Sequence, residues 1–158
     1  MDEVYLSPDA FERLQTELAW RTGERRIEIS VWIERAREHG DIRENADYDA
    51  AKNEQGHNEA RVRHLEALLR DAKVVEGSGA ADVVAPGMIV EVRMDDDEQT
   101  THYLVGSIEE RHDSFDVLST SSPLGQALMG ATPGQVVEYK APKRNIHVEV
   151  ISVKPRDA

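Results

Sequence analysis

The chain has 158 residues, enough for one large domain or two small ones. Its 31 Asp and Glu against 19 Lys and Arg give a formal net charge of −12, and because this overall field repels phosphate, any contact with nucleic acid must be local or arranged by a partner. The absence of cysteine excludes a disulfide framework and a cysteine-based zinc site.

The composition of the chain changes near residue 75. Residues 1–75 hold three of the ten glycines and one of the six prolines. This shift predicts a helical domain over 1–75, a linker over 76–86 and a β-rich domain over 87–158. The N-terminus, MDEVYLSPDA, has neither a basic segment nor an apolar run, and no stretch approaches ~18 consecutive apolar residues. We therefore expect no signal peptide, no membrane span and a cytoplasmic protein.

Ser7-Pro8-Asp9 predicts the start of the first helix, with Ser7 as N-cap. Apolar residues then recur at steps of three and four, with one irregular step near Leu18. The first seam runs through Phe11, Leu14, Leu18, Thr22, Arg25, Ile29, Trp32 and Ala36. The seam of a second helix runs through Tyr48, Ala51, Gln55, Asn58, Val62, Leu65, Leu69 and Ala72. We expect the polar residues in the middle of the two seams to face each other: Thr22, Arg25, Gln55 and Asn58.

Two such helices joined by a short turn form an antiparallel coiled-coil hairpin. About 30 residues per arm, at ~1.5 Å each, give a rod on the order of 45 Å. The alternative is that both helices belong to an ordinary bundle. A bundle needs a third long amphipathic helix, and the rest of the sequence offers no such segment.

The turn between the helices is Gly40-Asp41-Ile42-Arg43-Glu44. Gly40 suits a helix C-cap with positive φ, and Asn45 suits the N-cap of the second helix. Asp41 and Glu44 place two carboxylates at the end of the rod. Because magnesium usually takes only one or two protein oxygens, this pair fits a half-site that completes a metal held by another molecule. The competing interpretation is that the acids stabilise helix ends and keep the turn solvated.

Basic residues flank these acids on both helices: Arg35, Arg37, Arg43 and Lys52. A local cationic group around an acidic point suits a probe that contacts a phosphate backbone with its sides. The alternative is pairing with acids such as Glu34 and Glu38 along a solvated helix, which stabilises little.

After the linker, short apolar runs predict a small antiparallel sheet, so the fold class is α+β. The expected strands are Met88–Met94, His102–Val105, Phe115–Leu118, Val136–Tyr139 and Ile146–Val153. Ser122-Pro123 begins one short helix that Gly130 ends. The six histidines lack an HxxxH or HExxH spacing, so solvated or packed histidines are favoured over a metal site, and the Asp95–Glu98 run is interpreted as an acidic turn.

The segment REHGDIRENADYDAAKNEQG closely resembles the coiled-coil tip of the Gre family of bacterial transcript cleavage factors, of the GreA type, and SSPLGQALMGATPGQVVEYKAP is similar to that family's second signature. The resemblance extends over nearly the whole chain. It implies a coiled coil followed by a small FKBP-like domain that docks at the secondary channel of RNA polymerase. The coiled coil then enters the channel, and the polymerase cleaves its own backtracked RNA.

The resemblance also assigns roles to residues. The two tip acids of the family match Asp41 and Glu44, which would help to hold a second magnesium ion and a water within the polymerase. Arg37 and Lys52, with Arg43 nearby, match the basic patch that meets the RNA 3′ end. The polymerase-docking signature contains Ser122, Pro123, Leu124 and Gly125. We expect a monomer that is not an autonomous enzyme and has no cofactor of its own.

Three rival functions stay open at this point. A Gre-fold paralogue could occupy the same channel and inhibit, although such proteins tend to alter the tip acids. A peptidyl-prolyl isomerase would need an aromatic-lined pocket, and residues 76–158 supply only Tyr103, Phe115 and Tyr139. A plain coiled-coil adaptor would not need acids at the turn.

Overall fold

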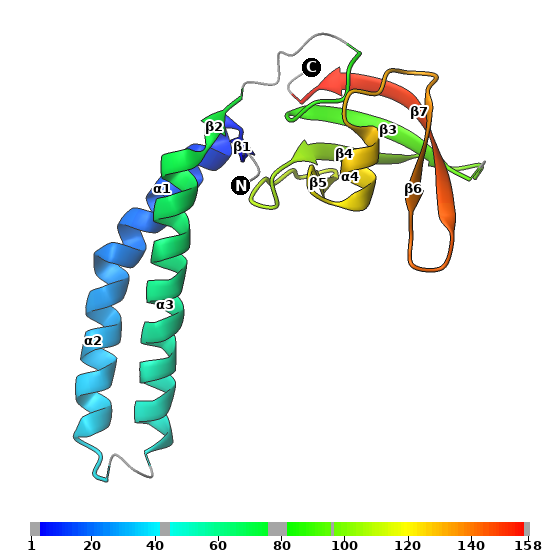
Figure 1. Cartoon of the computed structure of the whole chain (residues 1–158). Helices are drawn as coiled ribbons and strands as arrows, with labels where there is room; N and C mark the ends of the chain where they lie inside the picture. The colour runs from blue at the N-terminus through cyan, green and yellow to red at the C-terminus, as the bar shows by residue number, and fades with distance from the viewer. Residues whose placement is uncertain (1–3, 42–44, 76–81, 96, 157–158) are drawn as a thin grey trace. The chain divides into compact units, whose positions relative to one another are not determined.

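A computed structural model describes residues 4–41, 45–75, 82–95 and 97–156 (Figure 1). The elements are β1 (Tyr5–Leu6), α1 (Pro8–Thr22), α2 (Glu24–Arg37), α3 (Ala46–Asp71), β2 (Lys73–Val74), β3 (Met88–Met94), β4 (Thr101–Gly106), β5 (Asp116–Ser119), α4 (Pro123–Leu128), β6 (Val136–Lys140) and β7 (Asn145–Pro155). The chain groups into two compact units, Glu12–Asp71 and Met1–Phe11 with Ala72–Ala158. None of the helices in the described residues combines the length and the apolar character needed to cross a membrane.

The helical unit is the predicted hairpin, in which α2 runs antiparallel to α3 (Figure 1). The prediction of one continuous first helix was wrong, because the chain leaves helical geometry at Gly23, with φ −109° and ψ −96°. Glycine loses more backbone entropy than any other residue when it is placed in a helix interior. The regular spacing of apolar residues is also interrupted near Leu18, just before Gly23. A Cβ at this position would lie 3.2 Å from the carbonyl oxygen of Ala19. The first arm is therefore two helices, α1 and α2.

Apolar side chains hold the two ends of the hairpin, as predicted, although Ile33 and Leu68 were not among the predicted seam residues and the predicted Leu18 and Leu69 are only half-buried. The buried ones are Leu14, Ile29, Ile33 and Ala36 in the first arm and Ala51, Val62, Leu65 and Leu68 in α3. Trp32 packs on the seam against Ile29, Ile33 and Ala51. The expected pairing in the polar middle was wrong in detail, since Asn58 bonds to Arg21 and Arg25 bonds to Glu54.

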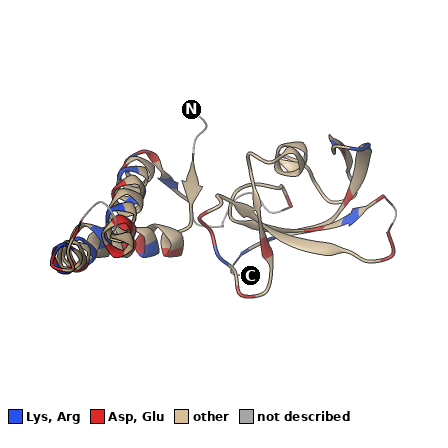
Figure 2. Cartoon of the chain, turned by 90° about the horizontal axis from the view of Figure 1, so that it is seen from below, with Lys and Arg blue, Asp and Glu red and all other residues tan. Residues whose placement is uncertain are grey.

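Both arms carry basic and acidic positions (Figure 2), and ion pairs between them link the arms at their middle. Glu17 accepts from Arg21 Nε at 2.6 Å and from Arg61 Nε and Nη2 at 2.9 and 3.0 Å. Hydrogen bonds from Arg61 first, and then from Arg21, lower the pKa of Glu17 to about 2, against partial burial that would raise it. Arg26 forms a two-bond pair with Glu59 at 2.8 and 3.0 Å.

The second unit contains a five-stranded sheet in the order β5-β4-β3-β7-β6. All five predicted strands are present, but the sheet is not wholly antiparallel, because β4 and β5 pair in parallel. The connection over residues 107–115 returns the chain to the end of the sheet where β4 began, so β5 runs the same way. α4 begins as predicted, with Ser122 Oγ accepting from Gly125 N at 3.0 Å. Val84, expected in the linker, is 1% exposed and belongs to the core of this sheet.

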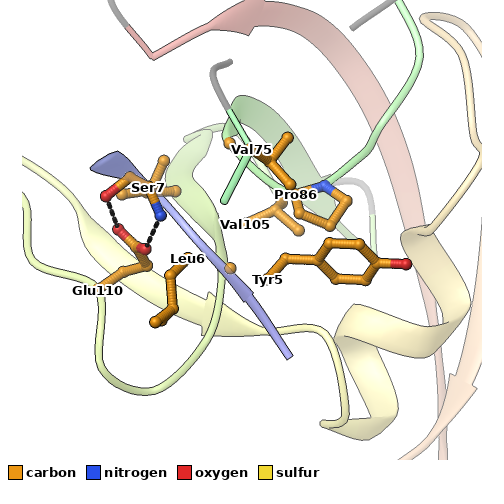
Figure 3. A pocket seen from close by; sticks show the side chains of 10 residues that line it. Tyr5, Leu6, Ser7, Val75, Pro86, Val105 and Glu110 are labelled. Carbon is orange, nitrogen blue, oxygen red and sulfur yellow. Dashed lines mark hydrogen bonds between the residues drawn. The ribbon is translucent and has the colours of Figure 1, made fainter. Parts of the chain in front are cut away.

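Residues before the first helix form a contact that the sequence did not reveal. β1 pairs in parallel with β2, and Ser7 caps α1 as predicted, accepting from Ala10 N at 3.1 Å. The Glu110 carboxylate in turn accepts from Ser7 N and Oγ, both at 2.7 Å (Figure 3). It also accepts from Arg156 Nη1 at 2.8 Å. The Glu110 side chain is only 5% exposed. One buried carboxylate therefore joins three segments that lie far apart in the sequence.

Removing this carboxylate should destabilise the unit that contains the sheet. Glu110→Ala leaves the half-buried Arg156 guanidinium and Ser7 amide without this acceptor, and we expect a loss of about 2 kcal/mol in the free energy of unfolding by urea. Glu98→Ala, which removes an exposed acid of the same unit, is the matched control and should change it by less than about 0.5 kcal/mol. Equal effects of the two substitutions would contradict the assignment.

The depressed pKa of Glu17 predicts a pH dependence of hairpin stability. The folded pKa of about 2 lies below the ordinary value of 4.5, so the contribution of this carboxylate is fully present above pH 4.5 and is lost as the pH falls toward 2. The free energy of unfolding of wild type should exceed that of Glu17→Gln by about 2 kcal/mol near neutral pH. This difference should disappear as the pH falls toward 2. Urea unfolding of both proteins, followed by circular dichroism across this range, measures it; a gap independent of pH would refute the ion pairs.

Candidate functional site

The candidate site is the turn that joins α2 to α3. α2 ends at Arg37, and the next residues tighten the chain, with Glu38 N donating to Arg35 O and His39 N donating to Ala36 O, both at 3.2 Å. Gly40 follows with φ +118°, as predicted from its position after the helix. A side chain at this φ would be strained, so glycine is required by the turn itself.

Asn45 starts the second arm and also fastens it to the first. Its Oδ1 accepts from Tyr48 N at 3.1 Å, which confirms the predicted N-cap. Its Nδ2 donates to the main-chain oxygen of Ala36 at 2.5 Å, one residue before the end of α2. Ala36 O thus accepts from Asn45 as well as from His39 N, and one amide side chain bonds to both helix ends.

Two aromatic side chains brace the helices just behind the turn. Trp32 Nε1 donates to Asp47 Oδ1 at 2.9 Å, so an indole on α2 binds a carboxylate in the first turn of α3. The guanidinium of Arg37 lies over the ring of Tyr48, with its carbon 5.9 Å from the ring centre. Both aromatic side chains also pack against the cluster of Ile29, Ile33 and Ala51. The two arms are therefore joined by polar and apolar contacts next to the turn.

The structure describes only part of the predicted acidic pair. Asp41 is exposed and directly follows Gly40, whereas Arg43 and Glu44 lie outside the described residues. Among the residues that the structure does describe, no group of three or more His, Asp or Glu side chains is placed to hold a metal. An exposed carboxylate at the end of a hairpin is chemically suited to add one ligand to an ion bound elsewhere, which is the half-site chemistry predicted for the turn.

The predicted basic flank is exposed on both arms. Arg35 and Arg37 are exposed on α2, and Lys52 is exposed on α3, where its Nζ donates to Gln55 Oε1 at 2.9 Å. None of the three forms an ion pair with an acid in the described part of the hairpin, whereas Arg25, Arg26 and Arg61 farther along the arms do.

The four residues of the expected docking signature divide into two groups. Pro123 is exposed and Ser122 is half-buried at the N-cap of α4. Leu124 and Gly125 are buried, and a Cβ at Gly125 would lie 2.0 Å from the main-chain oxygen of Ser119. Leu124 and Gly125 therefore shape this surface from beneath, and Pro123 lies on it.

Two contributors to the site were not predicted from the sequence. The second bond of Asn45, to Ala36, depends on how closely the arms approach, which an N-cap pattern does not reveal. Asn58, more than three turns away along α3, holds the first arm where it breaks. Its signal in the sequence was a short amide in the polar middle of the seam, between Gln55 and Val62, which did not reveal its partner Arg21.

The chain matches a known family over both of its parts. Residues 4–74 match the family described as transcription elongation factor, N-terminal. Residues 79–155 match the family described as transcription elongation factor, GreA/GreB, C-term. The division between the two matches falls where the composition of the sequence changes.

Known proteins with the same description are similar to this chain over nearly its full length. Transcription elongation factor GreA of Saccharopolyspora erythraea is 43% identical over 154 residues, which cover 96% of this chain and 94% of that protein. The protein of the same name from Streptomyces coelicolor is 42% identical, over 96% of this chain and 93% of its own. The solved structure of the transcription factor Gfh1 is 29% identical over 96% of this chain and 97% of its own, with a TM-score of 0.46. The family assignment is drawn from the sequence matches.

Proposed function

This chain belongs to the GreA/GreB family of transcription elongation factors, and from that membership we propose that it binds bacterial RNA polymerase and stimulates cleavage of backtracked RNA by the polymerase itself. It acts in the cytoplasm as a monomer, inserting the hairpin through the secondary channel. On this proposal the chain is not an autonomous enzyme. The hydrolytic centre belongs to the polymerase, and the chain completes it.

The observation that carries the proposal is the position of Asp41. It lies exposed at the end of a braced helical hairpin, and Glu44 follows three residues later in the sequence. An inhibitory paralogue would not need these acids, and a simple adaptor would not need them at the turn. The preserved pair therefore favours stimulation of cleavage over occupation of the channel alone.

Asp41 and Glu44 would hold a magnesium ion jointly with the polymerase. When bound there, such an ion stabilises the charge that develops on the reacting oxygens of a phosphodiester. The carboxylates of this chain would add oxygen ligands and orient the attacking water by accepting a hydrogen bond from it. The described part of the chain offers no third acid beside Asp41, which suits a shared site.

The other exposed groups have matching roles in this proposal. Arg37 and Lys52, with Arg43 in the turn, would contact the phosphates at the RNA 3′ end, and their local charge offsets the repulsion expected from a chain of net charge −12. Pro123 and Ser122 would contact the polymerase outside the channel. The buried Leu124 and Gly125 would keep that surface in place.

The test is RNA cleavage in an arrested elongation complex with magnesium. Wild-type chain should shorten the RNA from its 3′ end, and Asp41→Asn and Glu44→Gln should each lower the rate by at least about tenfold because a ligand to the shared ion is lost. Binding of both variants to the polymerase should be unchanged, since the docking surface is elsewhere.

Glu34→Gln is the matched control, because it removes an exposed acid from α2 without altering the turn. It should cleave like wild type. Full cleavage by the Asp41→Asn, Glu44→Gln double variant would overturn the role of the turn. Failure of the wild-type chain to stimulate cleavage while it binds the polymerase would favour the inhibitory alternative.

A further inference from the structure

The break in the first arm is held from the opposite arm by one buried amide. α1 ends at Thr22 and α2 begins at Glu24, with Gly23 between them. Asn58 of α3 is 1% exposed; its Nδ2 donates to the main-chain oxygen of Arg21 at 3.1 Å, and its Oδ1 accepts from Arg21 Nη1 at 3.0 Å. The last carbonyls of a helix lack partners within it, so Asn58 satisfies one at the end of α1.

Packing around this break is otherwise sparse. Between Leu14 and Ile29, no apolar side chain of the first arm is fully buried in the described structure. A hollow of about 300 Å³ opens beside the amide, lined by Arg26, Ile29, Ser30, Gln55, Asn58 and Glu59. The other links between the arms at this level are ion pairs between partly exposed side chains, which stabilise little. Asn58 therefore provides the buried contact that aligns the arms here.

A buried polar residue in an otherwise apolar helix interface selects one alignment at a cost in stability. If the arms slid or straightened, Asn58 would lose both of its bonds to Arg21 and keep only the 3.4 Å bond from Nδ2 to Glu59 Oε2 on its own helix. Its buried Oδ1 would then be unsatisfied, at a cost of about 1–3 kcal/mol. Glu17 adds to this selection, because it binds Arg21 and also Arg61 of the opposite arm. Other alignments of the two arms would therefore be less stable, because they lose the bonds of the Asn58 amide and the ion pairs of Glu17.

We propose that Asn58 is a positioning residue for transcript cleavage. Its amide fixes the bend at Gly23 and the alignment of the two arms, and so determines where Asp41 is delivered. The functional half of this inference rests on the proposed function. The structural half concerns the hairpin alone and can be tested without the polymerase.

The decisive variant is Asn58→Leu, which replaces the amide by an apolar side chain of similar size. The chain has no cysteine, so spin labels at Gln15→Cys on α1 and Glu34→Cys on α2 report the distance across the break. We expect a broader distance distribution in Asn58→Leu, together with a thermal midpoint that does not fall. Cleavage at saturating protein should fall about tenfold or more, because the carboxylates are misplaced by an ångström or more.

Gln55→Leu is the matched control, because it also replaces an amide by leucine, one helical turn away in the same seam. Among the described contacts, Gln55 has no bond to the first arm. It should keep the narrow distribution and cleavage within about twofold of wild type. Asn58→Ala is a second variant should Asn58→Leu not fold, and it should broaden the distribution too.

The two measurements separate the possible failures. An unchanged distribution in Asn58→Leu overturns the inference whatever the cleavage rate. A broadened distribution with normal cleavage shows that Asn58 holds the bend but does not position the carboxylates, and it overturns the functional half. If wild type itself stimulates no cleavage, the proposed function fails, and the distance distribution alone still decides whether Asn58 holds the bend.

Discussion

The hairpin depends on each helical arm covering the narrow apolar seam of the other. α2 buries only Ile29, Ile33 and Ala36, and an isolated helix with so small an apolar face is marginal in water. Pairing with α3 buries those residues and lets Asn45, at the start of α3, bind the end of α2. Everything proposed for this chain follows from that pairing, because it holds a short acidic turn at the end of a long support.

The support is built from two kinds of contact with different consequences. Apolar contacts near both ends supply most of the stability, since burial is favourable in almost any alignment. Polar contacts at the middle, centred on Asn58 and Glu17, supply less stability but tolerate only one alignment. A factor that must place an oxygen atom within an ångström or so of its target benefits more from the second kind than from the first.

Local patterns were sufficient to predict both arms of the hairpin, α4 and the five strands of the main sheet, whereas β1, β2 and the non-local contacts were not predicted. The caps at Ser7, Asn45 and Ser122 obey rules that operate within one helical turn, so they could be identified from the sequence. The parallel pairing of β4 with β5 and the carboxylate of Glu110 on the first turn of α1 depend on contacts between distant segments, and no periodicity encodes them. The break at Gly23 combines local and non-local causes. The glycine and the irregular apolar spacing near Leu18 could be read from the sequence, but the bond from the Asn58 amide that holds the break could not.

The central claim is that the turn reaches the RNA 3′ end inside a backtracked polymerase. The most direct measurement places a photoreactive amino acid at His39, beside the turn, and at His64 farther along α3 as the reference. Crosslinking to the 3′ end of the RNA should be strong from His39 and weak from His64. Equal crosslinking from the two positions, or crosslinks from His39 to the polymerase exterior alone, would contradict the account.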